Sequence, residues 1–145
     1  GIADGRGMAA AFCLGASAVQ VGTRFIVANE CTASDNYKDK VLKAKDTSTM
    51  ITGNSTGHPV RVLKNKFAKR LKKMGDENLP PEEFERLGAG ALKKAVVDGD
   101  VDNGSVMAGQ IAGLVSERQS AKEILLDIVC GCEKIIGKMT DEFSG

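Results

Sequence analysis

Residues 1–28 read GIADGRGMAAAFCLGASAVQVGTRFIVA, and this stretch decides the prediction of the fold. It contains two loops of small residues, at 1–7 and 20–23, with one amphipathic helical segment between them. In (β/α)8 barrels, the loops that follow the seventh and eighth strands often hold a phosphate group. The stretch therefore predicts the last units of such a barrel with half of a phosphate site. It also indicates that the chain is the C-terminal part of a larger enzyme.

The local patterns around these two loops agree with a barrel. Asp4 is a plausible N-cap for a helix over residues 5–14, because alanines favour helix and Gly15 can end it. Residues 18–21 (AVQV) form a short apolar run with β-branched side chains, which predicts a barrel strand. Residues 24–28 then predict the beginning of another short helix.

The glycines of the two loops suit a phosphate dianion, which needs several converging N–H donors and no side chains in the way. The candidate donors are Gly1, Gly22, and the N–H and hydroxyl of Thr23. A short glycine turn is by itself usually only a turn, but two such loops between strand-like and helix-like segments favour the phosphate site. Asp4 and Arg6 are interpreted as an N-cap and a surface side chain.

Residues 29–145 predict an α-rich extension that packs over the mouth of the barrel. Pro80 and Pro81 precede two glutamates and indicate a helix start, since proline fits the first turn and acidic side chains suit the helix dipole there. The strongest helical pattern covers residues 120–139, which carry a stripe of isoleucine and leucine. Further helices are predicted over 36–44, 64–74 and 87–97, and extended segments over 47–52 and 58–63.

The charges of the chain nearly cancel, since 20 basic and 19 acidic residues among 145 leave a net charge of +1. This balance excludes a polyanion-binding surface that spans the whole chain. One local exception is the segment 64–73 (KNKFAKRLKK), which carries six basic and no acidic residues. A solvated helix face is favoured for it, and a docking patch for an acidic partner is the alternative. Nucleic acid is disfavoured because Phe67 is the only aromatic residue there.

No metal site and no membrane segment are predicted. The cysteines are expected to be reduced thiols, and Cys130 and Cys132 lie in C-x-C spacing far from His58, the only histidine. Asp98 begins an acidic loop, but Gly109 stands where a calcium-binding hand needs glutamate. His58 is interpreted as structural rather than as a general base. The reduced thiols lead us to expect a cytoplasmic protein. No apolar run is long enough to span a membrane, and the absence of a signal-peptide pattern says little.

Three stretches resemble a known superfamily. Residues 1–25 resemble the late-barrel region of the nitronate monooxygenase and enoyl-reductase superfamily of FMN-binding TIM barrels. Residues 57–66 (GHPVRVLKNK) and 84–115 (FERLGAGALKKAVVDGDVDNGSVMAGQIAGLV) are similar to the FMN-dependent enoyl-acyl carrier protein reductases of the FabK type. The resemblance extends from Gly1 to about residue 139.

The resemblance implies an α/β fold, with the C-terminal part of a (β/α)8 TIM barrel at 1–28 and the α-rich C-terminal extension at 29–145. It implies that NADH or NADPH reduces FMN, which passes hydride to the β-carbon of a trans-2-enoyl thioester in type II fatty acid synthesis. The implied partners are an acyl carrier protein, the other half of the barrel, and a second copy of the protein in a homodimer.

Carried over from that family, the FMN phosphate lies against both loops of residues 1–28. The family's catalytic histidine belongs to the first half of the barrel, so this chain is expected to hold no catalytic residue, and His58 does not replace that histidine. The cofactor-binding positions that the resemblance implies are Gly1, Gln20, Val21, Gly22 and Thr23.

Two alternatives remain open. A nitronate monooxygenase would oxidise alkyl nitronates with FMN and oxygen, but those proteins tend to carry serine directly after the Gly-Gln pair. Here Gly109 and Gln110 are followed by Ile111, which favours the reductase. The other alternative is a non-catalytic α-rich fragment. Half of a barrel leaves sheet edges and apolar faces uncovered, so the chain alone is expected to be unstable, aggregated or paired with the other half.

Overall fold

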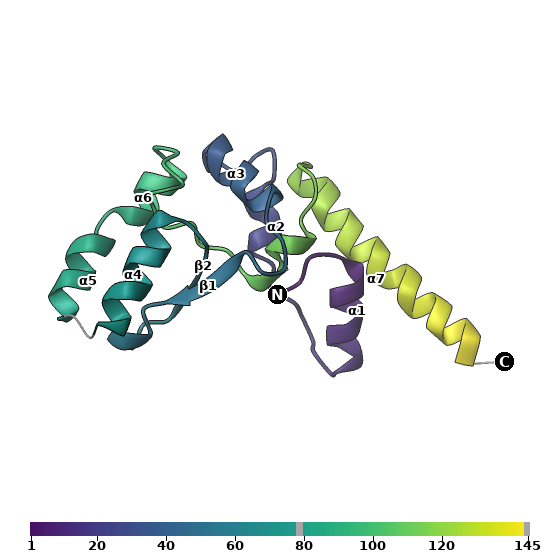
Figure 1. Ribbon diagram of the computed structural model, residues 1–145. Helices are drawn as coiled ribbons and strands as arrows, with labels where there is room; N and C mark the ends of the chain where they lie inside the picture. The colour runs from purple at the N-terminus through teal and green to yellow at the C-terminus, as the bar shows by residue number, and fades with distance from the viewer. Residues whose placement is uncertain (78–79, 144–145) are drawn as a thin grey trace.

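The computed structural model describes residues 1–77 and 80–143 and shows a mostly helical chain with one small sheet (Figure 1). The α-helices described are α1 (Gly5–Cys13), α2 (Thr23–Ile26), α3 (Asp35–Leu42), α4 (Lys66–Asp76), α5 (Pro81–Gly88), α6 (Ala91–Val96) and α7 (Ala121–Phe143). The shorter elements described are the strands β1 (Thr49–Thr52) and β2 (Val60–Leu63) and the 3₁₀ helices η1 (Asn54–Thr56) and η2 (Gln110–Leu114).

Helix α1 begins with the predicted N-cap. The Asp4 carboxylate accepts the backbone N–H of Arg6 at 3.0 Å and that of Gly7 at 3.3 Å, so it satisfies two of the donors that a helix start leaves free. The Arg6 guanidinium folds back to 2.7 Å from the same carboxylate. This hydrogen bond lowers the pKa of Asp4, against a smaller opposing effect of burial. The interpretation of Asp4 as an N-cap is therefore confirmed.

Helices α1 and α7 lie side by side, although they come from opposite ends of the chain (Figure 1). Gly5 faces the backbone of α7 so closely that a Cβ atom there would overlap backbone atoms of Gly131 and Cys132. A Cβ atom on Gly131 would in turn lie 3.3 Å from the Gly5 Cα. The crossing therefore depends on glycine in both helices. It joins the first residues of the chain to α7.

The predicted strand at residues 18–21 is absent. A strand needs a hydrogen-bonded neighbour, and among the described residues the sheet contains only β1 and β2. Val21 instead packs against a small core that Ala28 forms with Ile124 and Ile128 of α7. The prediction of a strand at this position is therefore wrong for the chain as it folds here.

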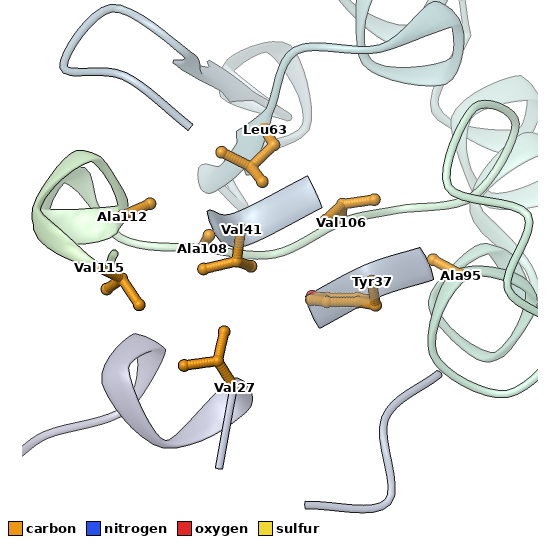
Figure 2. Packing of buried hydrophobic residues seen from close by; sticks show 9 residues of the cluster. All are labelled: Val27, Tyr37, Val41, Leu63, Ala95, Val106, Ala108, Ala112 and Val115. Carbon is orange, nitrogen blue, oxygen red and sulfur yellow. The ribbon is translucent and has the colours of Figure 1, made fainter. Parts of the chain in front are cut away.

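The larger core lies between α2, α3, β2, α6 and η2, and Figure 2 shows its side chains pointing toward one another. Val41, Val106 and Ala112 are fully buried, and Tyr37 brings an aromatic ring into the same cluster. The cluster consists of Val27, Tyr37, Val41, Leu63, Ala95, Val106, Ala108, Ala112 and Val115. It connects the helix that follows the second loop with the middle of the chain.

The sheet confirms both predicted extended segments. Strands β1 and β2 run antiparallel, with Thr49 opposite Leu63 and Thr52 opposite Val60. Val62 also forms an antiparallel bridge with Met107, so the segment that leads into η2 lies along the free edge of β2. This bridge brings residues far apart in sequence into one layer beneath α4.

Two predicted helices differ from the structure at glycine and asparagine positions. The helix predicted over 87–97 is divided into α5 and α6, because Gly90 has a φ of +71°, a left-handed conformation that ends regular helix. Helix α4 begins at Lys66 rather than at residue 64, because the Asn65 side chain caps it by accepting the Ala68 N–H at 2.7 Å. The helices predicted at 36–44 and 120–139 are confirmed, with ends that differ by a few residues.

Candidate functional site

The second loop ends at the N-terminus of α2, which no side chain caps. Gly22 occupies the N-cap position, is exposed, and would have no atom within 4 Å of an added Cβ. The first N–H groups of a helix have no partner inside the helix, and they attract anions. The surroundings of Gly22 therefore leave open room in front of unpartnered donors, as the phosphate prediction requires.

Thr23 links this loop to a segment that lies 86 positions later. Its hydroxyl oxygen accepts the Gly109 N–H at 2.8 Å. A hydroxyl that accepts one hydrogen bond still has its own proton to donate, so Thr23 keeps a donor for a ligand. Gly109 is closely packed at this point, since a Cβ there would lie 3.3 Å from the Thr23 oxygen.

The first loop meets the same segment. A Cβ atom on Gly1 would lie 3.1 Å from Cγ1 of Ile111, so Gly1 packs directly against the side chain that follows Gln110. Gly1 and Thr23 therefore approach a common segment, 109–111, from the two loops. The structure brings the two loops together around that segment.

Gln20 and Val21 take different positions from the glycines. Gln20 is exposed, whereas the side chain of Val21 is half-buried against the core next to α7. Val21 therefore offers only its backbone to a ligand on the loop side. The assignment of all five positions to a cofactor stays a prediction.

Two buried cations hold α2 in place. Arg24 is buried and donates to the Glu117 carbonyl at 3.2 Å and to the Gln119 side chain. Lys38 of α3 is also buried, and its ammonium donates to the Ala28 carbonyl at 2.8 Å, just beyond the end of α2. Because these cations are engaged on the inner side, they fix the helix while its N-terminus stays open.

The segment that leads to Gly109 is anchored by Tyr37. The buried Tyr37 hydroxyl donates to the Met107 carbonyl at 2.7 Å. Burial raises the pKa of Tyr37 to about 12. The phenol therefore stays protonated and able to donate over the physiological range.

The other candidate residues have structural partners or lie apart from the loops. Asp100 accepts from Asn103 and pairs with Lys94 at 3.3 Å, and the hydrogen bonds from Asn103 lower the pKa of Asp100 to about 2. Asp102 pairs with Lys40 at 3.4 Å. Within residues 1–77 and 80–143, no group of three or more His, Cys, Asp or Glu side chains is placed to hold a metal. The cysteines are free thiols.

The sequence interpretation missed the role of the segment 109–111 in the site. The Gly-Gln pair distinguished two branches of a superfamily there, whereas the structure places Gly109 against the second loop and Ile111 against the first. No local pattern reveals this contact, because it joins positions far apart in the chain.

The described helices include none that is both long and apolar enough to cross a membrane.

Comparisons with known proteins show which proteins this chain resembles. A profile of the nitronate monooxygenase family matches residues 1–131. FabK from Thermotoga maritima has a similar structure, with a TM-score of 0.91 and 45% identity over 97% of this chain and 45% of that one. A nitroalkane oxidase from Streptomyces ansochromogenes has a TM-score of 0.76 and 25% identity over 95% of this chain and 39% of that one.

A relative identified by sequence is a probable nitronate monooxygenase from Staphylococcus saprophyticus, which is 32% identical over 139 residues. That match covers 95% of this chain and 39% of the relative, so the chain spans less than half the length of the proteins it matches. The resemblance predicted from sequence is confirmed, since the family profile covers most of the chain, including both loops and the segment 109–111. The chain therefore belongs to the nitronate monooxygenase family.

Proposed function

We propose that this chain is the C-terminal portion of an FMN-dependent enoyl-thioester reductase that uses NADH or NADPH and acts on substrates held by an acyl carrier protein. The observation that carries the proposal is the likeness to FabK from Thermotoga maritima, at 45% identity, against 32% for the probable nitronate monooxygenase. Ile111 agrees with this choice, because it stands where the nitronate branch tends to have serine and packs directly on Gly1.

Bound FMN would supply the hydride for this reaction. The residues of this chain fit its phosphate, because the N-terminus of α2 is uncapped, Gly22 leaves open room, and the Thr23 hydroxyl can still donate. Gly1, in the first loop, has no side chain that would keep the phosphate away from the backbone. The share of this chain in the reaction is therefore to hold the phosphate group.

The proposal includes the division of the chain into two parts that the sequence predicts. Residues 1–28 would form the last units of the barrel, and residues 29–145 would form the extension over its mouth. The packing of α7 on α1 ties the end of the extension back to the barrel segment through Gly5 and Gly131 (Figure 1).

The exposed face of α4 supports an acidic carrier protein as the partner. All six basic residues of the segment 64–73 are exposed. Lys66 pairs with Asp102 at 3.6 Å and Lys73 pairs with Glu77 at 3.6 Å. The other cations of the helix form no ion pair with any residue that the structure describes, and these are Lys69, Arg70 and Lys72.

The neighbouring helix limits the size of this positive surface. Helix α5 packs beside α4 and exposes three acidic residues, Glu82, Glu83 and Glu85. The positive surface is therefore about one helix long, roughly 16 Å at the usual rise per residue. A nucleic acid or an anionic membrane would meet the glutamates as well, whereas a small acidic protein can contact α4 alone.

The test is oxidation of NADH or NADPH by the full-length enzyme with crotonyl thioester as acceptor, before and after removal and replacement of FMN. Turnover that depends on both FMN and the enoyl thioester supports the proposal. Bound FMN without enoyl turnover, together with oxygen uptake on an alkyl nitronate, would assign the chain to the alternative, a nitronate monooxygenase.

A further inference from the structure

A cavity of about 200 Å³ lies beneath α4, between α5, α6 and the sheet. Phe67 and Phe84 are nearly buried in its wall, and His58 is exposed. Among the described residues of the wall there is no Asp, Glu, Lys or Arg. The described residues that line the cavity are Thr52, Gly53, Thr56, His58, Val60, Phe67, Leu71, Phe84, Gly88, Ala91, Leu92, Ser105 and Met107.

The segment that borders this cavity also leads to the cofactor loops. Ser105 and Met107 line the cavity, whereas Val106 and Ala108 belong to the larger core, so successive side chains alternate between the two. Two positions after Met107, Gly109 donates to the Thr23 hydroxyl. The cavity therefore adjoins the candidate phosphate site through five residues of extended chain.

The chemistry of the wall selects an apolar occupant. The Thr56 hydroxyl donates to the Gly53 carbonyl at 2.9 Å, and the Thr52 hydroxyl donates to the Val60 carbonyl at 3.5 Å. These protons are therefore engaged within the protein. His58 and Ser105 are the other polar side chains of the wall. The described wall has no lysine or arginine to offset the desolvation of a phosphate or carboxylate, which disfavours an anionic ligand.

The size of the cavity suits an aliphatic chain of moderate length. A dry cavity of about 150 Å³ lined by aliphatic and aromatic side chains holds benzene, so by volume about 200 Å³ corresponds to roughly eight carbon atoms. We propose that this cavity binds the aliphatic tail of the thioester substrate and sets the preferred chain length. This proposal rests on the proposed reductase function, because that function supplies the acyl thioester.

Gly88 provides a direct test. It lines the cavity at the end of α5, and an added Cβ would have no atom within 4 Å, so a side chain can enter without a clash against the backbone. Gly88→Phe should fill the cavity, and Gly88→Ala is the matched control, because it changes the same backbone position and leaves the volume almost free. Leu92→Ala should enlarge the cavity, because Leu92 lies in its wall.

The first measurement compares kcat/KM for crotonyl and trans-2-decenoyl thioesters on the same carrier protein, with the full-length, FMN-loaded enzyme. Gly88→Phe should lower the value for the decenoyl substrate roughly tenfold or more, since several methylene groups lose their apolar surroundings, and should leave the crotonyl value within about twofold. Gly88→Ala should keep the ratio of the parent enzyme, and Leu92→Ala should shift it toward longer chains. Equal changes for both substrates, or no change, would overturn the cavity assignment while the reductase function stands.

A binding measurement separates the two proposals. Saturated octanoyl and butyryl thioesters are titrated by calorimetry into the same enzyme, with no turnover required. Tighter binding of the octanoyl compound that Gly88→Phe abolishes and Gly88→Ala preserves supports the cavity, even if no enoyl substrate is reduced. Binding that does not depend on chain length, as expected if another part of the protein fills the cavity, overturns it.

Discussion

The Thr23 side chain joins the two parts of the candidate site, because its hydroxyl accepts the Gly109 N–H at 2.8 Å and keeps a proton for a ligand. Thr23→Val removes both hydrogen bonds at nearly constant volume, whereas Thr23→Ser keeps the hydroxyl. A hydrogen bond to a charged group is worth about 1.5–3 kcal/mol, so the valine variant should bind FMN roughly tenfold to hundredfold more weakly. Flavin fluorescence titration of the full-length apoenzyme measures this. Equal losses in the valine and serine variants would show that the hydroxyl does not contact the cofactor.

Tyr37 gives a second prediction for a single residue. Tyr37→Phe removes the donor to the Met107 carbonyl and should destabilise the fold by about 1–3 kcal/mol, measured by denaturant unfolding. Because the folded pKa of about 12 lies above the unfolded value of about 10, this stabilisation is complete below pH 10 and is lost as the pH rises through 12. The difference between ultraviolet titrations of the full-length enzyme and of its Tyr37→Phe variant reports the pKa of Tyr37. A midpoint near 10 would contradict the burial of the Tyr37 hydroxyl.

Among the contacts between elements, the crossing of α1 and α7 depends most strictly on particular residues. Gly5→Ala would place a methyl group onto backbone atoms of Gly131 and Cys132 and should cost about 1–3 kcal/mol in unfolding free energy. Gly137→Ala is the matched control on α7, because its Cβ would meet no atom within 4 Å and alanine favours helix. The control should raise stability by about 0.5–1 kcal/mol. Two variants of equal stability would mean that the helices do not approach this closely.

The elements also show how far local patterns determine this fold. The cap at Asp4, the proline at the start of α5 and the stripe of α7 are local signals, and each of them predicted its helix. Residues 18–21 carry a strand pattern, but a strand depends on a neighbour that local sequence does not describe. The contacts of Gly1 and Thr23 with the segment 109–111 are long-range in the same way. The candidate loops were therefore predictable, whereas the segment that joins them was not.

For the whole molecule, the charge distribution matters more than the net charge of +1, because a positive surface on α4 adjoins acidic residues on α5. If an acidic carrier protein docks on α4, charge reversal should weaken binding of the carrier and leave the chemistry unchanged. The test variant changes three cations on α4 to glutamate, namely Lys69, Arg70 and Lys72. The control makes the same change in charge on α7, at Lys122, Lys134 and Lys138.

The α4 variant should raise KM for the crotonyl-loaded carrier protein roughly tenfold, since exposed charge pairs contribute about 0.2–1 kcal/mol each. KM for crotonyl N-acetylcysteamine should stay the same, because that substrate carries no protein to dock. Added salt should raise KM of the parent enzyme for the carrier and narrow its difference from the α4 variant, because exposed charges are screened. The α7 control should behave as the parent. An unchanged KM for the carrier in the α4 variant, or an equal rise in the α7 control, would exclude α4 as the docking surface and leave it as a solvated helix face.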